Sequence, residues 1–227
     1  KSVGIVGTSG AGKSTIVDIL LGLLHAQEGE ITCDGTNIFK NYESWLAQIG
    51  YIPQSIYLVD ESIRDNIAFG IDEDLIDDKR IWNILEEAQL KEFVEGLPEG
   101  LDTTIGDRGI RLSGGQRQRV WIAMALCQGT KTLFLDEPTT YLDIRYQIEI
   151  LQLVKKLNQE FGITIIMVLH DINQAITYSD NIIGMKDGVV LVEGDPEEVI
   201  TEESIRELYG IELGVTKVDG RKFVLAV

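Results

Sequence analysis

A glycine-rich loop between a predicted strand and a predicted helix constrains this fold more than any other feature. Residues 7–14 read Gly-Thr-Ser-Gly-Ala-Gly-Lys-Ser. The apolar residues 3–6 predict a buried strand, and the spacing of apolar residues over 14–21 predicts a helix. Glycines let successive N–H groups turn toward phosphate oxygens, and the helix adds its positive end. The segment therefore predicts a phosphate-binding loop, with Lys13 on the β- and γ-phosphates and Ser14 on Mg²⁺.

Length, composition and net charge limit the classes of protein to which this chain can belong. The 227 residues, 44% of them apolar, suffice for one large domain or for a core with an inserted subdomain. A formal net charge of −17 argues against nucleic acid as the main partner. Cys33 and Cys127 lack metal-ligand spacing, which favours a reduced compartment. The apolar stretch 163–169 is too short to cross a bilayer. We therefore expect a soluble cytosolic enzyme.

A second glycine cluster and an acidic pair follow further along the chain. Ser113 precedes Gly-Gly-Gln and can cap a helix over 114–126. The apolar segment 132–136 predicts a strand that ends in Asp136 and continues with Glu137. A carboxylate at the end of such a strand suits Mg²⁺, and the next one suits a base that orients a water molecule.

Taken in order, these motifs resemble the nucleotide-binding domain of ABC transporters over nearly the whole chain. Leu-Ser-Gly-Gly-Gln at 112–116 resembles the signature motif that separates these ATPases from other P-loop proteins. Gln54, after Tyr-Ile-Pro, resembles the Q-loop glutamine, and Asp143, after Thr-Tyr-Leu, resembles the D-loop aspartate. His170 follows the predicted strand 163–169 and resembles the switch histidine.

The resemblance implies a role for each matching residue. Glu137 would polarise the attacking water, and His170 would contact the γ-phosphate and help to hold that water in line. The implied metal site combines Ser14, Gln54 and Asp136. The implied ATP-binding residues are Ser9, Gly10, Ala11, Gly12, Lys13, Ser14 and Thr15. The residues implied to contact the ATP of a partner subunit are Ser113, Gly114, Gly115 and Gln116.

The resemblance also implies an α/β fold, with a parallel-sheet P-loop NTPase core over residues 1–53 and 122–227. An inserted helical subdomain over 54–121, with amphipathic patterns at 79–88 and 90–96, would carry the signature motif and dock on membrane subunits. Because the sequence begins at the strand of the phosphate loop, we expect it to lack the upstream antiparallel strands and the adenine-stacking aromatic ring of relatives.

Other patterns refine the architecture. Two Asp-Gly turns predict hairpins, one joining 182–185 to 189–192 and the other joining 214–218 to 222–227. No long heptad insertion separates the phosphate loop from the signature motif. This argues against the ABC ATPases of DNA repair and chromosome structure, which place a coiled coil there.

The two parts of the chain resemble different subfamilies. Residues 1–119 resemble exporters and flippases, and the segment 104–109 is similar to the exporter X-loop. Residues 120–227 resemble importers of iron–siderophore chelates. We therefore expect a recombinant of two ABC domains with a join near 116–119. The alternative is one natural protein with mixed features.

The leading functional hypothesis is a Mg²⁺-dependent ATPase that forms a head-to-tail homodimer on binding ATP. It would drive membrane-spanning subunits from the cytoplasmic face of the membrane. A second hypothesis is a module that holds nucleotide with little turnover. A third, a soluble ABC factor of translation or repair, is disfavoured by the acidic charge and by the Q-loop region. The transported substrate and the direction of transport stay open.

Overall fold

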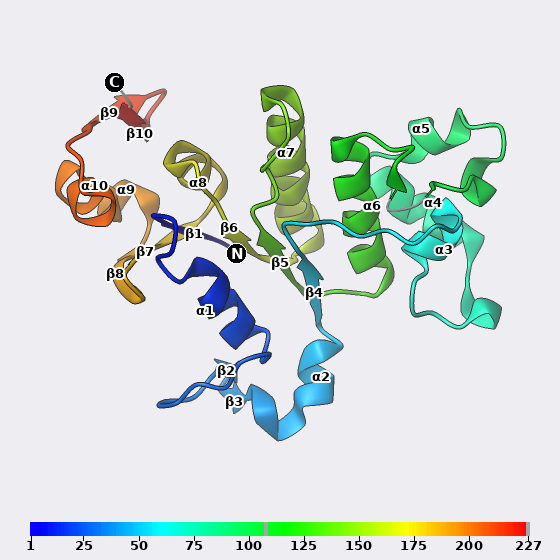
Figure 1. Ribbon diagram of the computed structural model, residues 1–227, viewed down its shortest axis with the longest axis horizontal. Helices are drawn as coiled ribbons and strands as arrows, with labels where there is room; N and C mark the ends of the chain where they lie inside the picture. The colour runs from blue at the N-terminus through cyan, green and yellow to red at the C-terminus, as the bar shows by residue number, and fades with distance from the viewer. Residues whose placement is uncertain (107–108, 226–227) are drawn as a thin grey trace.

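The structure of the chain, a computed structural model, describes residues 1–106 and 109–225 and has a six-stranded sheet at its centre (Figure 1). In spatial order the strands are β4 (Ile49–Ile52), β5 (Thr132–Asp136), β6 (Thr164–Val168), β1 (Ser2–Gly7), β7 (Asn181–Lys186) and β8 (Val189–Gly194). The strands from β4 to β7 run parallel, and β8 returns antiparallel to β7. The prediction of an α/β fold with a mainly parallel sheet is confirmed.

Helices and two short hairpins complete the described residues. The α-helices are α1 (Lys13–Leu20), α2 (Tyr42–Leu46), α3 (Ile63–Ile67), α4 (Asp78–Glu87), α5 (Lys91–Glu95), α6 (Gly114–Cys127), α7 (Ile144–Phe161), α8 (Ile172–Tyr178), α9 (Pro196–Val199) and α10 (Glu202–Tyr209). The 3-10 turns are η1 (Ile38–Asn41), η2 (Glu73–Leu75) and η3 (Gly100–Asp102). The hairpins pair β2 (Thr32–Cys33) with β3 (Thr36–Asn37), and β9 (Gly214–Val218) with β10 (Arg221–Leu225).

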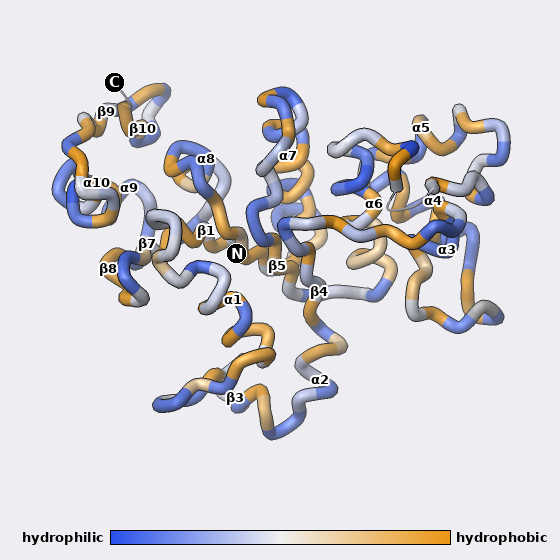
Figure 2. The backbone as a smooth tube through the Cα atoms, viewed as in Figure 1, coloured by the Kyte–Doolittle hydropathy of each residue, from blue (hydrophilic) through white to orange (hydrophobic). Residues whose placement is uncertain are grey.

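Different helices cover the two faces of the sheet, because successive strand residues point to opposite faces. Phe134 of β5 joins an apolar cluster with α1 and with Trp45 of α2. Its neighbours Leu133 and Leu135 join the larger cluster with α7 and α8. Figure 2 shows the hydrophobic colour along β1 and β5. Both faces of the parallel strands are therefore buried, as parallel sheets require.

Residues 58–127, which we call the helical region, have an apolar core of their own. Helices α3, α4 and α5 pack with α6 through side chains such as Ile67, Leu85 and Val120. Ile122 of the same helix α6 packs into the core of the sheet instead. Helix α6 therefore joins the helical region to the sheet, beyond the edge strand β4 (Figure 1).

The predicted local elements agree with the structure. The helices expected over 79–88 and 90–96 are confirmed as α4 and α5, with bounds shifted by one residue. Both Asp-Gly hairpins are confirmed, although residues 226–227 of the last predicted strand lie outside the described residues. In the part of the chain that the structure describes, no helix is both long enough and apolar enough to span a membrane.

Candidate phosphate-binding and hydrolysis site

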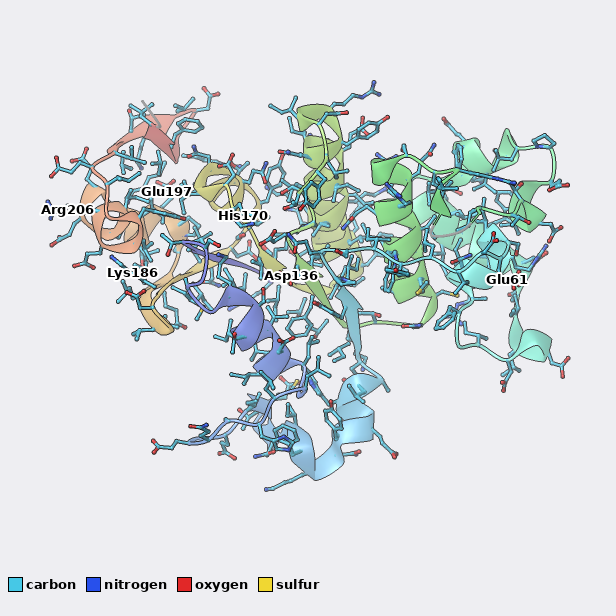
Figure 3. The ribbon with its side chains drawn as sticks, viewed as in Figure 1. Glu61, Asp136, His170, Lys186, Glu197 and Arg206 are labelled. Carbon is cyan, nitrogen blue, oxygen red and sulfur yellow. The ribbon has the colours of Figure 1, made fainter. Side chains whose placement is uncertain are left out.

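Neighbouring strands bring the predicted site residues to one edge of the sheet. In spatial order, β4 leads to Gln54, β5 ends at Asp136 and leads to Glu137, β6 leads to His170, and β1 leads to the phosphate loop. The carboxyl ends of parallel strands meet at one edge, which is where α/β sheets bind ligands. Figure 3 shows the labels of Asp136 and His170 at the central sheet, far from Glu61 in the helical region.

The loop between β1 and α1 has the conformation that its glycines predict. Gly7, Gly10 and Gly12 have φ angles of 149°, 79° and 92°, which L-residues rarely adopt. No side chain caps the N-terminus of α1, so its first N–H groups are open to an anion. A pocket of about 250 Å³ lies here, lined by Ser9, Gly10, Gly12, Lys13, Ser14, Thr15, Glu137 and His170.

The loop rests closely on the hairpin of β7 and β8. A Cβ on Gly7 would lie 2.1 Å from the carbonyl oxygen of Met185. The N–H of Gly188, in the hairpin turn, donates to the carbonyl oxygen of Ala11 at 3.1 Å. Ala11, the one predicted ATP-binding residue whose side chain does not line the pocket, is 2% exposed. The hairpin therefore packs against one side of the loop. The side of the loop that lines the pocket stays open.

The side chain of Lys13 is folded back on the loop. Its Nζ donates to the carbonyl oxygens of Gly7 at 3.0 Å and Thr8 at 2.9 Å. Burial lowers the pKa of Lys13, and the negative charges of Glu137 and Asp136 partly oppose this effect. The ammonium group is thus held inside the loop by two carbonyl oxygens, a role that phosphate oxygens can take over.

Glu137 is the residue at which the predicted site elements meet. Its Oε1 lies 2.6 Å from Nε2 of His170. Its Oε2 accepts hydrogen bonds from Nε2 of Gln54 at 2.5 Å and from Oγ1 of Thr140 at 3.2 Å. The backbone of Glu137 has a φ of +51°, which is uncommon for a residue other than glycine. Such backbone strain is concentrated at functional sites.

Asp136 is a buried carboxylate with room for a cation. It is 9% exposed, and its Oδ1 has no hydrogen-bond partner. Burial raises the pKa of Asp136, and the charge of Glu137 raises it further, while a hydrogen bond with the side chain of Ser14 lowers it. A buried anionic oxygen without a partner is costly unless a cation binds it. The side chains of Ser14 and Asp136 are therefore suited to bind Mg²⁺. Gln54, the third predicted ligand, is hydrogen-bonded to Glu137.

No ready-made metal cage exists among the residues that the structure describes, because no three His, Cys, Asp or Glu side chains are arranged so that they could hold a metal ion. This agrees with the way proteins hold Mg²⁺, through one or two carboxylates together with substrate phosphates and water.

The signature motif lies apart from this pocket. Ser113 caps α6 as predicted, because its Oγ accepts from the N–H of Gln116 at 3.2 Å and Oε1 of Gln116 accepts from the N–H of Ser113 at 2.8 Å. None of the residues 113–116 lines the pocket. Asp143 caps α7 by accepting from the N–H of Tyr146 at 3.1 Å. The chain thus brings Gln54, Glu137 and His170 together but not the signature.

The signature glycines pack against the segment that follows Glu137. A Cβ on Gly114 would lie 2.9 Å from Leu142, and one on Gly115 would lie 2.7 Å from the ring of Tyr146. Gly115 therefore lets α6 pack closely on the ring of Tyr146 at the start of α7, whereas at Gly114 the close atom is a terminal methyl group of Leu142. The sequence motif alone indicated only an anion-binding helix start.

Two contacts of the site were not predicted. Thr140 donates to Glu137, and its only sequence signal is its position shortly after the acidic pair. Tyr51 of β4 is hydrogen-bonded to Asp136, and burial together with that carboxylate raises the pKa of Tyr51 to about 12. Its only sequence signal is its position three residues before Gln54. Part of the predicted X-loop, residues 107–108, lies outside the described residues.

Comparisons with known proteins agree with this geometry. The family model described as ABC transporter matches residues 1–140. A petrobactin import ATP-binding protein of Bacillus anthracis is 39% identical over 97% of this chain and 81% of its own length. The ferric enterobactin transport ATP-binding protein of Escherichia coli is 36% identical over 91% of this chain and 76% of its own length.

A solved structure, that of a bacterial Atm1-family ABC exporter with ATP bound, is similar with a TM-score of 0.74 and 36% sequence identity. The similarity covers 85% of this chain, which spans 33% of the exporter chain. Importer and exporter proteins are thus both similar to it. The match to the petrobactin import protein runs through residues 116–119, so the comparisons do not support the expected join of two ABC domains.

A phosphate loop, a carboxylate pair at a strand end and the family match over residues 1–140 lead to one conclusion. The chain belongs to the ABC transporter family, as an ATP-binding domain of the kind that hydrolyses ATP with Mg²⁺ to drive transport.

Proposed function

We propose that Glu137 is the general base of ATP hydrolysis and that His170 and Gln54 hold it in place. The supporting observation is the set of short contacts from both residues to the carboxylate of Glu137 beside the phosphate pocket. A carboxylate that accepts hydrogen bonds on both oxygens is fixed in orientation, which is what a base needs to act on one water molecule. The same three residues favour turnover over a module that only holds nucleotide.

Phosphate binding is assigned to residues 9–15. The free N–H groups at the start of α1 surround the phosphates, and Lys13 moves from the carbonyls of Gly7 and Thr8 to the β- and γ-phosphate oxygens. Ser14 and Asp136 would hold Mg²⁺, and Gln54 would be a further ligand. When bound, the metal neutralises developing charge on the phosphates.

The site is completed by a second copy of the chain, arranged head to tail. The supporting observation is that the phosphate pocket contains no residue of the signature motif, although Ser113 is exposed at the start of helix α6, where an anion is favoured. In the pair, residues 113–116 of each copy cover the phosphates bound by the other. Residues 54–121 then act as the helical subdomain that moves the signature.

The membrane partner is a pair of transmembrane subunits, which the domain meets at the cytoplasmic face of the membrane. Relatives that match most of this chain are named as import proteins for petrobactin, iron(3+)-hydroxamate and ferric enterobactin. We therefore propose an iron–siderophore chelate as the transported substrate.

Phosphate release by the purified chain tests the catalytic proposal. Turnover should require Mg²⁺ and should disappear when Glu137 is replaced by Gln, whereas nucleotide binding should persist. Turnover without Mg²⁺, or at an unchanged rate in Glu137→Gln, contradicts the proposal.

A second experiment tests the partner. The chain is reconstituted in lipid discs with the membrane subunits of a petrobactin importer or with the membrane domain of an Atm1-family exporter. Stimulation of ATPase activity by the importer subunits supports iron–siderophore import. Stimulation by the exporter domain alone contradicts it.

A further inference from the structure

The position of the His170 ring depends mainly on the backbone that carries it. Nε2 of His170 lies 2.6 Å from Oε1 of Glu137, and 52% of the His170 side chain is exposed, so packing holds it only in part. Before His170 the chain is fixed in the sheet, because the N–H of Leu169 donates to the carbonyl oxygen of Ile5 at 3.0 Å. After His170 the chain enters α8. The placement of α8 therefore affects where the ring points.

The first turn of α8 is tied to the segment that follows Glu137. Oε1 of Gln174 accepts from Oγ1 of Thr139 at 3.2 Å. Nε2 of Gln174 donates to Oε1 of Gln147, on α7, at 2.8 Å. One side chain of α8 thus holds the helix next to the chain that carries the catalytic carboxylate.

The same turn of α8 is also tied to the hairpin of β9 and β10. Nδ2 of Asn173 donates to the carbonyl oxygen of Val224, on β10, at 3.0 Å, and Oδ1 of Asn173 accepts from the N–H of Val224 at 2.8 Å. The side-chain amide supplies the donor and the acceptor that a neighbouring strand would present. Val224 is 1% exposed, so its backbone groups need such partners. Asn173 therefore takes the place of a further strand at the free edge of β10 (Figure 1).

The hairpin has anchors of its own and can therefore act as a support. The N–H of Lys222 donates to Oε1 of Glu197, on α9, at 2.6 Å. Nζ of Lys222 donates to the carbonyl oxygen of Ile200 at 2.6 Å. Val224 belongs to the same buried apolar cluster as Ala175 of α8. These contacts fix the hairpin independently of Asn173.

We propose that Asn173 is a positioning residue for ATP hydrolysis and that the hairpin of β9 and β10 supports the catalytic site through it. The inference rests on the proposed role of His170 and extends that role to a residue and a segment outside the phosphate pocket. Asn173 does not line this pocket. It acts by holding the start of α8, and with it the backbone of His170, against the anchored hairpin.

The proposed effect depends on small displacements. A helix of seven residues, such as α8, is not held in place by its own hydrogen bonds. Replacing Asn173 by Ala leaves the buried N–H and carbonyl of Val224 without these partners, which favours separation of the hairpin from α8. The contact between His170 and Glu137 then loses its geometry. A displacement of about 1 Å in a catalytic site can lower a rate by roughly 10²-fold.

The first measurement follows the ring of His170 in the chain without nucleotide. The sequence has two histidines, His25 and His170, so a carbon–proton NMR spectrum contains two sets of imidazole signals. His25→Gln assigns the two sets. His25 stacks on Phe39 with ring centroids 4.3 Å apart, and its signals serve as an internal reference. We expect Asn173→Ala to shift or broaden the His170 signals and to leave the His25 signals in place.

The second measurement is steady-state ATP turnover with Mg²⁺. Asn173→Ala should lower kcat roughly tenfold, because it misplaces a group that holds the base. The KM for ATP should change by less than about twofold, because the proposed phosphate contacts come from residues 9–15. A role in stability alone would lower the folded fraction but would leave the His170 signals of the folded chain at their wild-type positions. Asn173→Asp keeps the acceptor for the N–H of Val224 and loses only the donor. It should move the same His170 signals, and it provides the test if the alanine variant does not fold.

The matched control is Asn158→Ala. Nδ2 of Asn158, on α7, donates to the carbonyl oxygen of Ile163 at 2.8 Å in a part-buried position. This variant also removes an asparagine side chain that binds the backbone, but its contact lies at the end of β6 opposite His170. Its His170 signals and its kcat should equal those of the wild type. The same changes in Asn158→Ala would show that general loosening is responsible, and would overturn the role of Asn173.

His170→Ala separates failure of this inference from failure of the proposed function. If His170→Ala loses turnover while Asn173→Ala keeps the wild-type His170 signals or the wild-type kcat, the positioning role is refuted and the proposed function stands. If His170→Ala turns over ATP at the wild-type rate, the proposed role of His170 fails, and the positioning role of Asn173 fails with it.

Discussion

Replacing Glu137 by Gln separates chemistry from binding. The amide has nearly the shape of the carboxylate, but it carries no charge and cannot take a proton from water. The wild-type carboxylate accepts from His170 at 2.6 Å, from Gln54 at 2.5 Å and from Thr140 at 3.2 Å. The amide has a single oxygen, so at least one of these donors has to turn away.

The effect on stability should be small because two changes oppose each other. A hydrogen bond to a charged group contributes about 1.5–3 kcal/mol, against about 0.5–1.5 kcal/mol for a neutral one. Gln54 and His170 are exposed to water, which reduces the difference. Loss of the charge also relieves repulsion with Asp136. We expect a net loss of about 1 kcal/mol, or a shift of about 2–4 °C in the thermal midpoint.

The effect on turnover should be much larger. A positioned general base contributes about 10²–10⁴-fold to a rate, which corresponds to roughly 3–5 kcal/mol of the barrier. The Kd for ATP should change little, because the proposed phosphate contacts come from residues 9–15. ATP should therefore accumulate in a dimer that does not turn over.

Three measurements check this prediction: phosphate release under saturating ATP, calorimetric ATP binding, and size-exclusion chromatography with ATP and Mg²⁺. Glu28→Gln is the matched control, since it removes the same charge from an exposed position after α1. Its turnover and its monomer–dimer profile should equal those of the wild type. A kcat in Glu137→Gln within about threefold of the wild type would refute the assignment of the base.

Further predictions concern the loop, the carboxylate of Asp136 and a close backbone contact. Lys13→Ala should weaken ATP binding at least roughly tenfold in calorimetry, because it removes the only ammonium placed inside the loop; unchanged affinity would contradict its role. Because burial raises the pKa of Asp136 in the folded state, ionisation of this carboxyl group destabilises the folded state. The stability that is present below the pKa of Asp136 in the unfolded state is therefore lost as the pH rises through its pKa in the folded state. Asp136→Asn should therefore raise the nucleotide-free thermal midpoint at pH 7 but not near pH 3, while Mg²⁺-dependent turnover is lost; a lower midpoint at pH 7 would be the wrong sign. Gly7→Ala should lose about 3 kcal/mol or more in denaturant unfolding, because its Cβ would meet the carbonyl of Met185 at 2.1 Å. Gly129→Ala, with a φ of 73° and open space around it, should lose only about 1–2 kcal/mol; equal losses would show that the contact is irrelevant.

Local features of this protein follow from the sequence. The glycines of the phosphate loop require positive φ angles, the Asp-Gly pairs form the two hairpin turns, and Ser113 with Gln116 caps α6. Each depends on interactions within a few residues, so backbone preference and side-chain chemistry decide them before the chain folds. The resemblance to ABC transporters predicted the members of the site from the same motifs.

Contacts between distant residues were decided only by the tertiary structure. Gln54 reaches Glu137 across 83 residues of sequence because β4, β5, β6 and β1 lie side by side in that order. The same packing leaves the signature outside the pocket and folds Lys13 back on its loop. Local sequence does not encode which strands become neighbours, because that choice depends on how the whole apolar core is buried. The sequence thus determined which residues could act on a phosphate, and only the fold decided which of them meet in one chain.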